Sequence, residues 1–307
     1  MRSILCPVDF SEPSREALRW AGMLARRMKA RLTVLSAVEP LLAEAAQLQL
    51  GRDLVRETEP ELREFAAATW SQKTAAALDA RFAVQVGPAA DAILRTAVTE
   101  SADLIVIGTH GLGGVRKWLL GSTTERVLRR AHTPVFTVPP SASGMLRSDA
   151  TTTPLALGPV LAATDFSDAS RRAIGWAADL AREFASQLCL VHVVEAVAAA
   201  PRWQSYLAYA DDARVVEAGP QLQTLAQQVA SRVDVDSVVV RGHAADAIAG
   251  VADERRASMI VMGLAGRDSA AGSRPGSIAY RVLCLAKVPV LVVQPQAADP
   301  LGDLTQP

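Results

Sequence analysis

An internal repeat constrains the fold of this chain more than any other feature. Val160 to Glu195 aligns without gaps on Ile4 to Glu39, and about 15 of the 36 aligned positions are identical. Further along, residues 84–93 (VQVGPAADAI) correspond to residues 239–248 (VVRGHAADAI). The chain therefore contains two copies of one domain, and any fold assigned to the first copy must also suit the second.

Each copy carries a glycine pattern directly after an apolar strand. Leu104 to Ile107 is an unbroken apolar run that ends in Gly108 and Gly111, followed by nine residues and then Gly121-Ser122. The second copy repeats this spacing with Ile260 to Met262, Gly263, Gly266, Gly276 and Ser277. Glycines permit positive φ and close backbone approach, and the helix that follows presents free N–H groups. The pattern predicts a phosphate-binding loop in each half.

Apolar strands alternate with amphipathic helices in both halves. In the first half, the strands are expected at residues 4–8, 32–38, 82–86, 104–107 and 134–138. This order predicts an α/β fold of two tandem doubly wound domains, each with a five-stranded parallel sheet and helices on both faces. Ser11 is a predicted N-cap, and residues 41–78 read as helix with breaks near Gly51 and Pro60. Residues 197–216 are expected to be less regular.

Composition marks a boundary between the two halves. Residues 140–157 are rich in Pro, Ser, Thr and Gly and lack helical periodicity, so we interpret them as a linker. The expected domains are therefore residues 1–139 and 158–295, with a polar tail at 296–307.

Charge and apolar run length argue against several classes of partner. Lys and Arg together number 32, equal to Asp and Glu, so the formal net charge is zero. This balance argues against a broad nucleic-acid groove or a polybasic membrane surface. The longest apolar runs have the length of strands, well below the roughly 18 residues needed to span a bilayer. Cys6, Cys189 and Cys284 lie in apolar runs without disulfide or metal spacing, so we expect buried thiols and a cytoplasmic protein.

The polar candidates gather where predicted strands end. Asp9 follows the first strand, Ala37 lies near the end of the second, and Gly108 follows the fourth. In parallel sheets of this kind, ligands bind beyond the carboxyl ends of the strands. Three separate stretches of the chain can therefore converge on one crevice.

These residues resemble a known family. The G-x-x-G, nine residues, G-S pattern, with an Asp ending the first strand, is similar to that of the nucleotide-binding universal stress proteins, over nearly all of both halves. The resemblance implies sheet order 3-2-1-4-5 and binding of ATP or another adenine nucleotide. It also implies that Asp9 contacts the nucleoside, that Pro7, Val8 and Ala37 line the adenine, and that Gly108, Gly111, Gly121 and Ser122 hold phosphates beside Thr123. The matching positions in the second half are Ala163, Thr164, Asp165, Val193, Gly263, Gly266, Gly276, Ser277 and Ile278.

The two predicted sites differ in the segment between their glycines. The first segment, LGGVRKWLL, carries Arg116 and Lys117, with Trp118, Leu119 and Leu120 as apolar anchors. The second, RDSAAGSRP, has only Arg267 and Arg274 as cations. A better anchored loop loses less entropy on ordering, so we hypothesise tighter nucleotide binding in the first half.

Several alternatives remain open at this point. Asp9 and Asp165 could cap helices, single glycines could be turn residues, and Arg116 and Lys117 could be solvated charges. His110 could touch phosphate, whereas His192 is expected to be structural. A dinucleotide-binding fingerprint and a P-loop are both missing from the expected positions.

The expected function is a stress-response protein that acts as a nucleotide-dependent sensor or scaffold. The alternatives are a slow ATPase, in which Ser122 could help hold Mg²⁺ through the nucleotide, and an interaction module with degenerate sites. We find no general base paired with either loop and assign no catalytic or metal-ligating residue. The resemblance also implies that the two halves pair as a pseudo-dimer, and two such chains could associate further as a homodimer.

Overall fold

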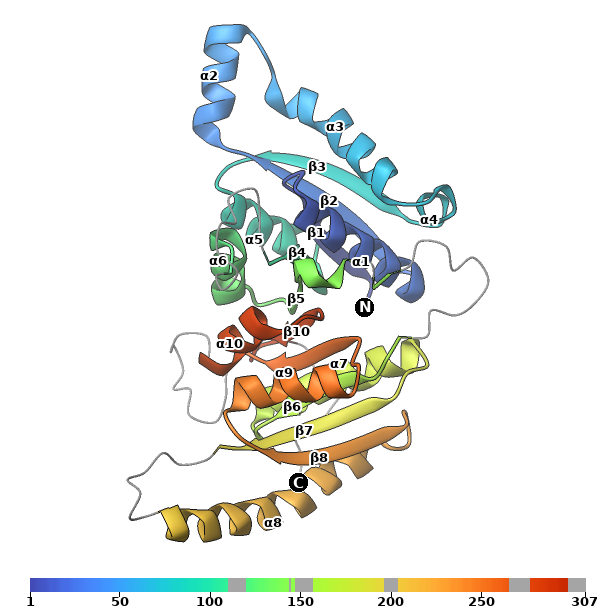
Figure 1. Cartoon of the computed structure of the whole chain (residues 1–307). Helices are drawn as coiled ribbons and strands as arrows, with labels where there is room; N and C mark the ends of the chain where they lie inside the picture. The colour runs from blue at the N-terminus through green and yellow to red at the C-terminus, as the bar shows by residue number, and fades with distance from the viewer. Residues whose placement is uncertain (110–119, 144, 147–156, 196–203, 265–276, 298–307) are drawn as a thin grey trace. The chain divides into compact units, whose positions relative to one another are not determined.

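The chain divides into two compact units, Met1–Asp149 and Ala150–Pro307. A computed structural model describes residues 1–109, 120–143, 145–146, 157–195, 204–264 and 277–297 (Figure 1). Within the described residues, both units contain five parallel strands, which confirms the predicted α/β class and the parallel sheet.

The sheet of unit 1 is built around its first strand. Hydrogen-bonded pairing gives the order β3-β2-β1-β4-β5, with Ile4 of β1 lying opposite both Leu32 of β2 and Leu104 of β4. All residues of β4 are buried, as expected of a central strand covered on both faces. The strands are β1 (Ser3–Pro7), β2 (Arg31–Val38), β3 (Ala80–Val86), β4 (Leu104–Gly108) and β5 (Val135–Val138).

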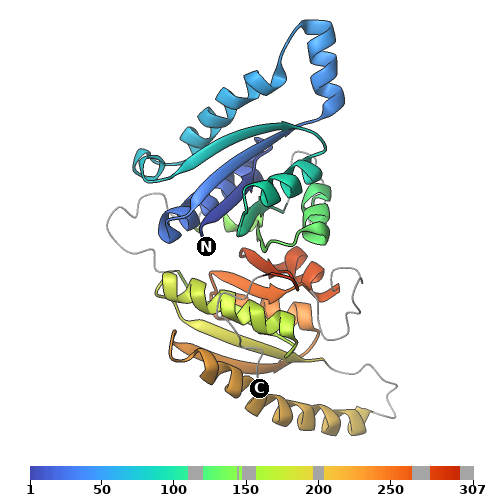
Figure 2. The same ribbon diagram turned by 180° about the vertical axis from the view of Figure 1, so that it is seen from behind.

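Helices cover both faces of this sheet (Figures 1 and 2). On one face, α1 (Glu12–Met28) packs on β1 and β4, and α3 (Leu54–Thr69) packs on β2 and β3. On the other, α5 (Ala89–Thr99) packs on β1 and β2 and contacts α6 (Ser122–Arg130). This division follows from right-handed crossovers. From β1 to β3 the strands are added toward one edge of the sheet, and from β4 to β5 they are added toward the other edge.

The segment between β2 and β3 corrects one expectation. The predicted break at Gly51 is confirmed: α2 (Pro40–Leu50) ends there, and Gly51 has a left-handed φ of 62°. The predicted break at Pro60 is wrong, since α3 runs through it and ends before Trp70. Pro60 is exposed, so water can satisfy the carbonyl that loses its partner, while buried Leu62, Phe65 and Ala66 anchor the helix. The described part of the unit also contains two short helices, α4 (Gln72–Ala76) and η1 (Pro140–Ala142).

Unit 2 repeats the arrangement. Its strands pair in the order β10-β9-β6-β7-β8, again with the first strand of the unit in the middle. Helix α7 packs mainly on β6 and β9, helix α8 packs on β7 and β8, and α9 contacts α10. The elements are β6 (Val160–Thr164), α7 (Asp168–Glu183), β7 (Leu188–Val194), α8 (Gln204–Val229), β8 (Val235–Arg241), α9 (Ala244–Glu254), β9 (Met259–Gly263), α10 (Ser277–Leu285) and β10 (Val290–Val293).

Helix α8 corrects a second expectation. Residues 204–216, predicted to be irregular, form the first half of this helix, while residues 196–203 lie outside the described part of the chain. The second half explains why the helix forms: Ala218, Leu222, Leu225 and Val229 recur at helical spacing and are all buried.

The cysteines follow the expected pattern with one exception. Cys6 and Cys189 are buried, and burial raises the pKa of both thiols. Cys284 is half-buried, contrary to the expectation of a fully buried thiol. Among the described residues, no helix is both long and apolar enough to cross a membrane.

Candidate functional site

The candidate site of unit 1 lies at the carboxyl ends of three adjacent strands. Strands β2, β1 and β4 are neighbours in the sheet and run parallel, so Ala37, Asp9 and Gly108 lie at the same edge. Val8 extends the pairing of β1 by donating its N–H to the carbonyl of Leu35 at 2.8 Å. The structure thus brings together the three predicted stretches.

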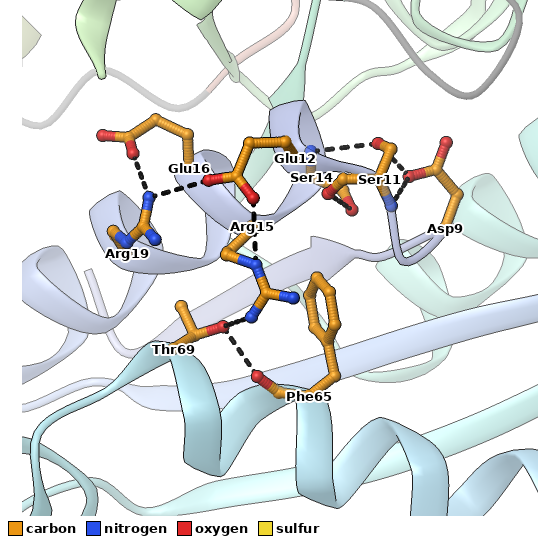
Figure 3. Close-up of polar contacts among 9 residues, drawn as sticks. All are labelled: Asp9, Ser11, Glu12, Ser14, Arg15, Glu16, Arg19, Phe65 and Thr69. Carbon is orange, nitrogen blue, oxygen red and sulfur yellow. Dashed lines mark hydrogen bonds and ion pairs between the residues drawn. The ribbon is translucent and has the colours of Figure 1, made fainter. Parts of the chain in front are cut away.

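Asp9 forms a tight turn with the residue that caps the next helix (Figure 3). The N–H and hydroxyl of Ser11 both donate to Asp9 Oδ1, at 3.1 and 2.5 Å. Ser11 in turn accepts from the N–H of Ser14 at 3.3 Å, which makes Ser11 the N-cap of α1, as predicted. Asp9 therefore orients the cap residue Ser11. In return, the two hydrogen bonds from Ser11 fix the direction of the Asp9 carboxylate.

Unit 2 reproduces this turn atom for atom. The N–H and hydroxyl of Ser167 donate to Asp165 Oδ1 at 3.1 and 2.6 Å, and Ser167 accepts from the N–H of Ser170 at 3.2 Å. The intervening residue is left-handed in both units: φ is 64° at Phe10 and 65° at Phe166. Non-glycine residues avoid this region unless their surroundings hold them there.

The glycine that ends the fourth strand is required by packing. A β-carbon on Gly108 would lie 2.9 Å from the carbonyl oxygen of Pro13, in the first turn of α1. At Gly263 it would lie 3.0 Å from the carbonyl carbon of Ala169, the position equivalent to Pro13. Gly108 and Gly263 therefore let the first turns of α1 and α7 lie close to the ends of β4 and β9, which is a role separate from any contact with phosphate.

The start of α6 closes the glycine segment of unit 1. Gly121 donates its N–H to the carbonyl of Thr109 at 2.8 Å. This hydrogen bond joins the two ends of the glycine segment. Thr124 donates its hydroxyl to the carbonyl of Gly108 at 2.8 Å. Gly121 caps α6 with φ −59° and no side-chain hydrogen bond, while Ser122 is exposed and Thr123 half-buried. The N–H groups in the first turn of α6 have no hydrogen-bond acceptor within the helix, so they are the donors that this part of the site can offer to a ligand.

The predicted adenine-lining residues are mostly withdrawn from solvent. Val8 and Thr164 are 4% and 5% exposed, whereas Pro7, Ala37 and Val193 are half-buried and Ala163 is buried. The hydroxyl of Thr164 lies 3.0 Å from that of Ser170 and accepts from the N–H of Phe166 at 3.1 Å.

Part of the predicted site lies outside the described residues. This applies to Gly111, Gly266, Gly276 and His110, to the cations Arg116, Lys117, Arg267 and Arg274, and to Trp118. Gly263, Ser277 and Ile278 remain at the base of the second glycine segment, and Ile278 is 39% exposed. The hypothesis that the first site binds more tightly rests on the undescribed segments and stays a prediction.

Sequence reasoning missed the aromatic neighbours of the Asp turn. In unit 1, the ring of Phe10 meets that of Phe65 edge to face at 5.4 Å, and Arg15 covers Phe65 at 3.9 Å. In unit 2, Phe166 instead packs on His192 at 4.4 Å. The only sequence signal was the difference between His192 and its counterpart Ser36 within an otherwise similar strand. The described residues contain no group of three or more His, Cys, Asp or Glu that could hold a metal.

Comparison with known proteins gives a uniform result. A family model described as the universal stress protein family matches residues 1–139 and again 157–294. Universal stress protein Rv2623 of Mycobacterium tuberculosis is 28% identical over 305 residues, covering 95% of this chain and 96% of that protein. A universal stress protein of Thermus aquaticus is 35% identical over 141 residues, covering 45% of this chain and 98% of its own. The crystal structure of a universal stress protein from Archaeoglobus fulgidus shares the fold, with TM-score 0.63 and 22% identity over 95% of this chain and 96% of that one.

Proposed function

The chain belongs to the universal stress protein family, and from that membership we propose that each unit binds an adenine nucleotide at the carboxyl edge of its sheet. The observation that carries the proposal is the Asp–Phe–Ser turn after the first strand, held by the same two hydrogen bonds in both units. Two copies that differ at more than half of their aligned positions keep this turn at the edge where open parallel sheets bind ligands.

The proposed binding mode uses groups that the fold brings to this edge. The carboxylates of Asp9 and Asp165 accept hydrogen bonds from ribose hydroxyls, because an ionised carboxylate is an acceptor only. Backbone groups at residues 7–8 and 37, and at 163–164 and 193, border the base. The N-termini of α6 and α10, which begin at Ser122 and Ser277, offer first-turn amides and a favourable helix dipole to the phosphates. A Mg²⁺ ion would enter with the phosphates.

We propose a sensing or scaffolding role for the bound nucleotide, in which its presence or form changes the conformation or partner choice of the protein. Slow ATP hydrolysis is the rival proposal. It predicts steady-state phosphate release that stops when the Asp9 and Asp165 sites are both disabled, whereas the sensing role predicts stable retention of ATP.

Variants of the two carboxylates test the binding proposal. Asp9→Asn and Asp165→Asn keep an oxygen that can accept from Ser11 or Ser167 but lose the charge. Each variant should remove one binding event in equilibrium dialysis with labelled ATP, and the double variant should remove both. Under the hypothesis of unequal sites, Asp9→Asn removes the tighter one.

Asp103 supplies a matched control. It also accepts from backbone N–H groups, those of Arg2 and Ser3, but it lies at the opposite edge of the sheet, before β4 begins. Asp103→Asn should therefore leave ATP binding intact. Equal loss of binding in Asp9→Asn and Asp103→Asn would reject the proposed site.

We also propose that residues 140–157 form a linker, that the two halves pair as a pseudo-dimer and that the protein is cytoplasmic. Two such chains could associate further as a homodimer. Sedimentation equilibrium of the intact chain distinguishes a monomer from a homodimer, and cell fractionation tests the location.

A further inference from the structure

The phenylalanine that follows each aspartate is held by different partners in the two units. We propose that Phe10 and Phe166 are positioning residues for Asp9 and Asp165, and that each unit clamps its phenylalanine in its own way. The consequence is that the two nucleotide sites can be loosened independently, by residues that never touch the nucleotide. This inference rests on the proposed function for its effect on binding, but the clamps themselves can be tested without a ligand.

The clamp of unit 1 comes from α3, which is far from Asp9 in sequence. Phe65 meets Phe10 edge to face, with the ring centroids 5.4 Å apart and the planes at 81°. The guanidinium of Arg15 lies over the Phe65 ring at 3.9 Å and donates to Thr69 Oγ1 at 3.0 Å and Glu12 Oε2 at 3.1 Å. Figure 3 shows Arg15 between the two helices, with its guanidinium beside the Phe65 ring. Arg15 thereby ties α1 to α3 around the aromatic pair.

The clamp of unit 2 comes from the neighbouring strand. The ring of His192 lies 4.4 Å from that of Phe166, with the planes at 37°. His192 Nδ1 is 2.8 Å from the carbonyl oxygen of Thr164, and because a carbonyl only accepts, Nδ1 carries the proton and donates. The imidazole is thus fixed in one orientation by the residue that directly precedes Asp165. The equivalent position in unit 1, Ser36, is buried and has no ring to offer.

Both clamps act on a strained residue at the centre of the Asp turn. A left-handed phenylalanine is unfavourable by itself and persists only where surrounding contacts hold it. The turn spans only Asp9 to Ser11, so the φ of Phe10 sets whether Ser11 can reach Asp9 Oδ1. Loss of the aromatic contact should therefore weaken the hydrogen bonds that orient the aspartate carboxylate. It should do so only in the unit that carries the substitution.

The first test reads the turn without ligand, by amide hydrogen exchange of Ser11 and Ser167 in the full chain. Phe65→Ala should speed exchange at Ser11 and leave Ser167 unchanged, and His192→Ser should do the reverse. Phe65→Tyr and His192→Phe keep a ring in place and should restore slow exchange. Leu62→Ala and Leu190→Ala are matched controls, because both residues are fully buried on the same elements, α3 and β7. The inference would be overturned if Leu62→Ala and Leu190→Ala changed exchange at Ser11 and Ser167 as much as Phe65→Ala and His192→Ser do.

The second test reads the nucleotide sites one at a time. With the other site disabled by Asp165→Asn or Asp9→Asn, Phe65→Ala and His192→Ser should each weaken ATP binding about two- to tenfold, the range expected for one aromatic contact. Unchanged affinity in both variants, or equal weakening by the Leu controls, contradicts the positioning role. If the wild-type chain binds no adenine nucleotide, the proposed function fails, and the exchange experiment still decides whether the clamps exist.

Discussion

Gly108 and Pro13 lie so close that a β-carbon on the glycine would be 2.9 Å from the proline carbonyl oxygen. This contact joins the end of β4 to the first turn of α1, and Gly263 and Ala169 repeat it in unit 2. A glycine substitution at this edge therefore tests helix–strand packing before it tests phosphate binding.

Gly108→Ala should lower the free energy of unfolding of unit 1 by about 1–3 kcal/mol, because the new methyl group meets backbone atoms that have little room to move. Chemical denaturation provides the measurement. Gly250→Ala is the matched control, because Gly250 lies inside α9 and a β-carbon there would meet nothing within 4 Å. Alanine at this position should be neutral or stabilising by up to about 1 kcal/mol. Equal stability of the two variants would contradict the packing role of Gly108.

The Asp turn and the helix cap should be energetically coupled. Ser11→Ala removes both the cap of α1 and the hydroxyl bond to Asp9, so we expect a loss of about 0.5–2 kcal/mol in the free energy of unfolding. In a double-mutant cycle, Asp9→Ala should cost much less once Ser11 is alanine, since contacting residues are not additive. Strict additivity of the two substitutions would show that the turn contributes nothing to the cap.

Burial of Cys6 predicts instability at alkaline pH. Burial raises the pKa of this thiol in the folded protein, while the unfolded chain ionises with a pKa of about 8.5. Below that pH both states are protonated, so the stability is fully present; above it the unfolded state loses a proton that the folded state keeps. The free energy of unfolding should fall by up to about 1.4 kcal/mol per pH unit from this group. Denaturation between pH 7 and 10 should show a smaller decline in Cys6→Ala, and an identical decline would refute the assignment.

Helix α2 carries leucines that contribute little to the stability of unit 1. Leu41 and Leu48 are 80% and 76% exposed, and Ala46 is the buried residue of this helix. Leu48→Gln should therefore change the free energy of unfolding by no more than about 0.5 kcal/mol. By contrast, Leu62→Ala in the neighbouring α3 should cost about 2–5 kcal/mol, because Leu62 is fully buried. A large loss in Leu48→Gln would mean that α2 is packed more tightly than its exposure indicates.

The sequence predicted what local patterns encode. Apolar runs located the strands of both units, Ser11 was recognisable as a cap, and Gly51 marked the end of α2. Pro60 misled because proline predicts a break from local geometry, whereas α3 is held by the tertiary contacts of Leu62 and Phe65.

The clamps escaped prediction for a different reason. Arg15 and Thr69 are 54 positions apart, and only the packing of α1 against α3 brings them together. The role of Gly108 was similarly hidden, since a glycine chosen for close helix packing looks the same in sequence as one chosen to approach a phosphate.

The nucleotide content of the purified protein decides whether each unit binds an adenine nucleotide. The purified protein is saturated with Mg-ATP, freed of unbound ligand and denatured, and the released nucleotide is identified by mass spectrometry and quantified per chain. We expect about two adenine nucleotides per chain, one for each unit, falling by one in Asp9→Asn and by one more when Asp165→Asn is added. A chain that releases none, even after exposure to millimolar Mg-ATP, would show that neither unit binds an adenine nucleotide.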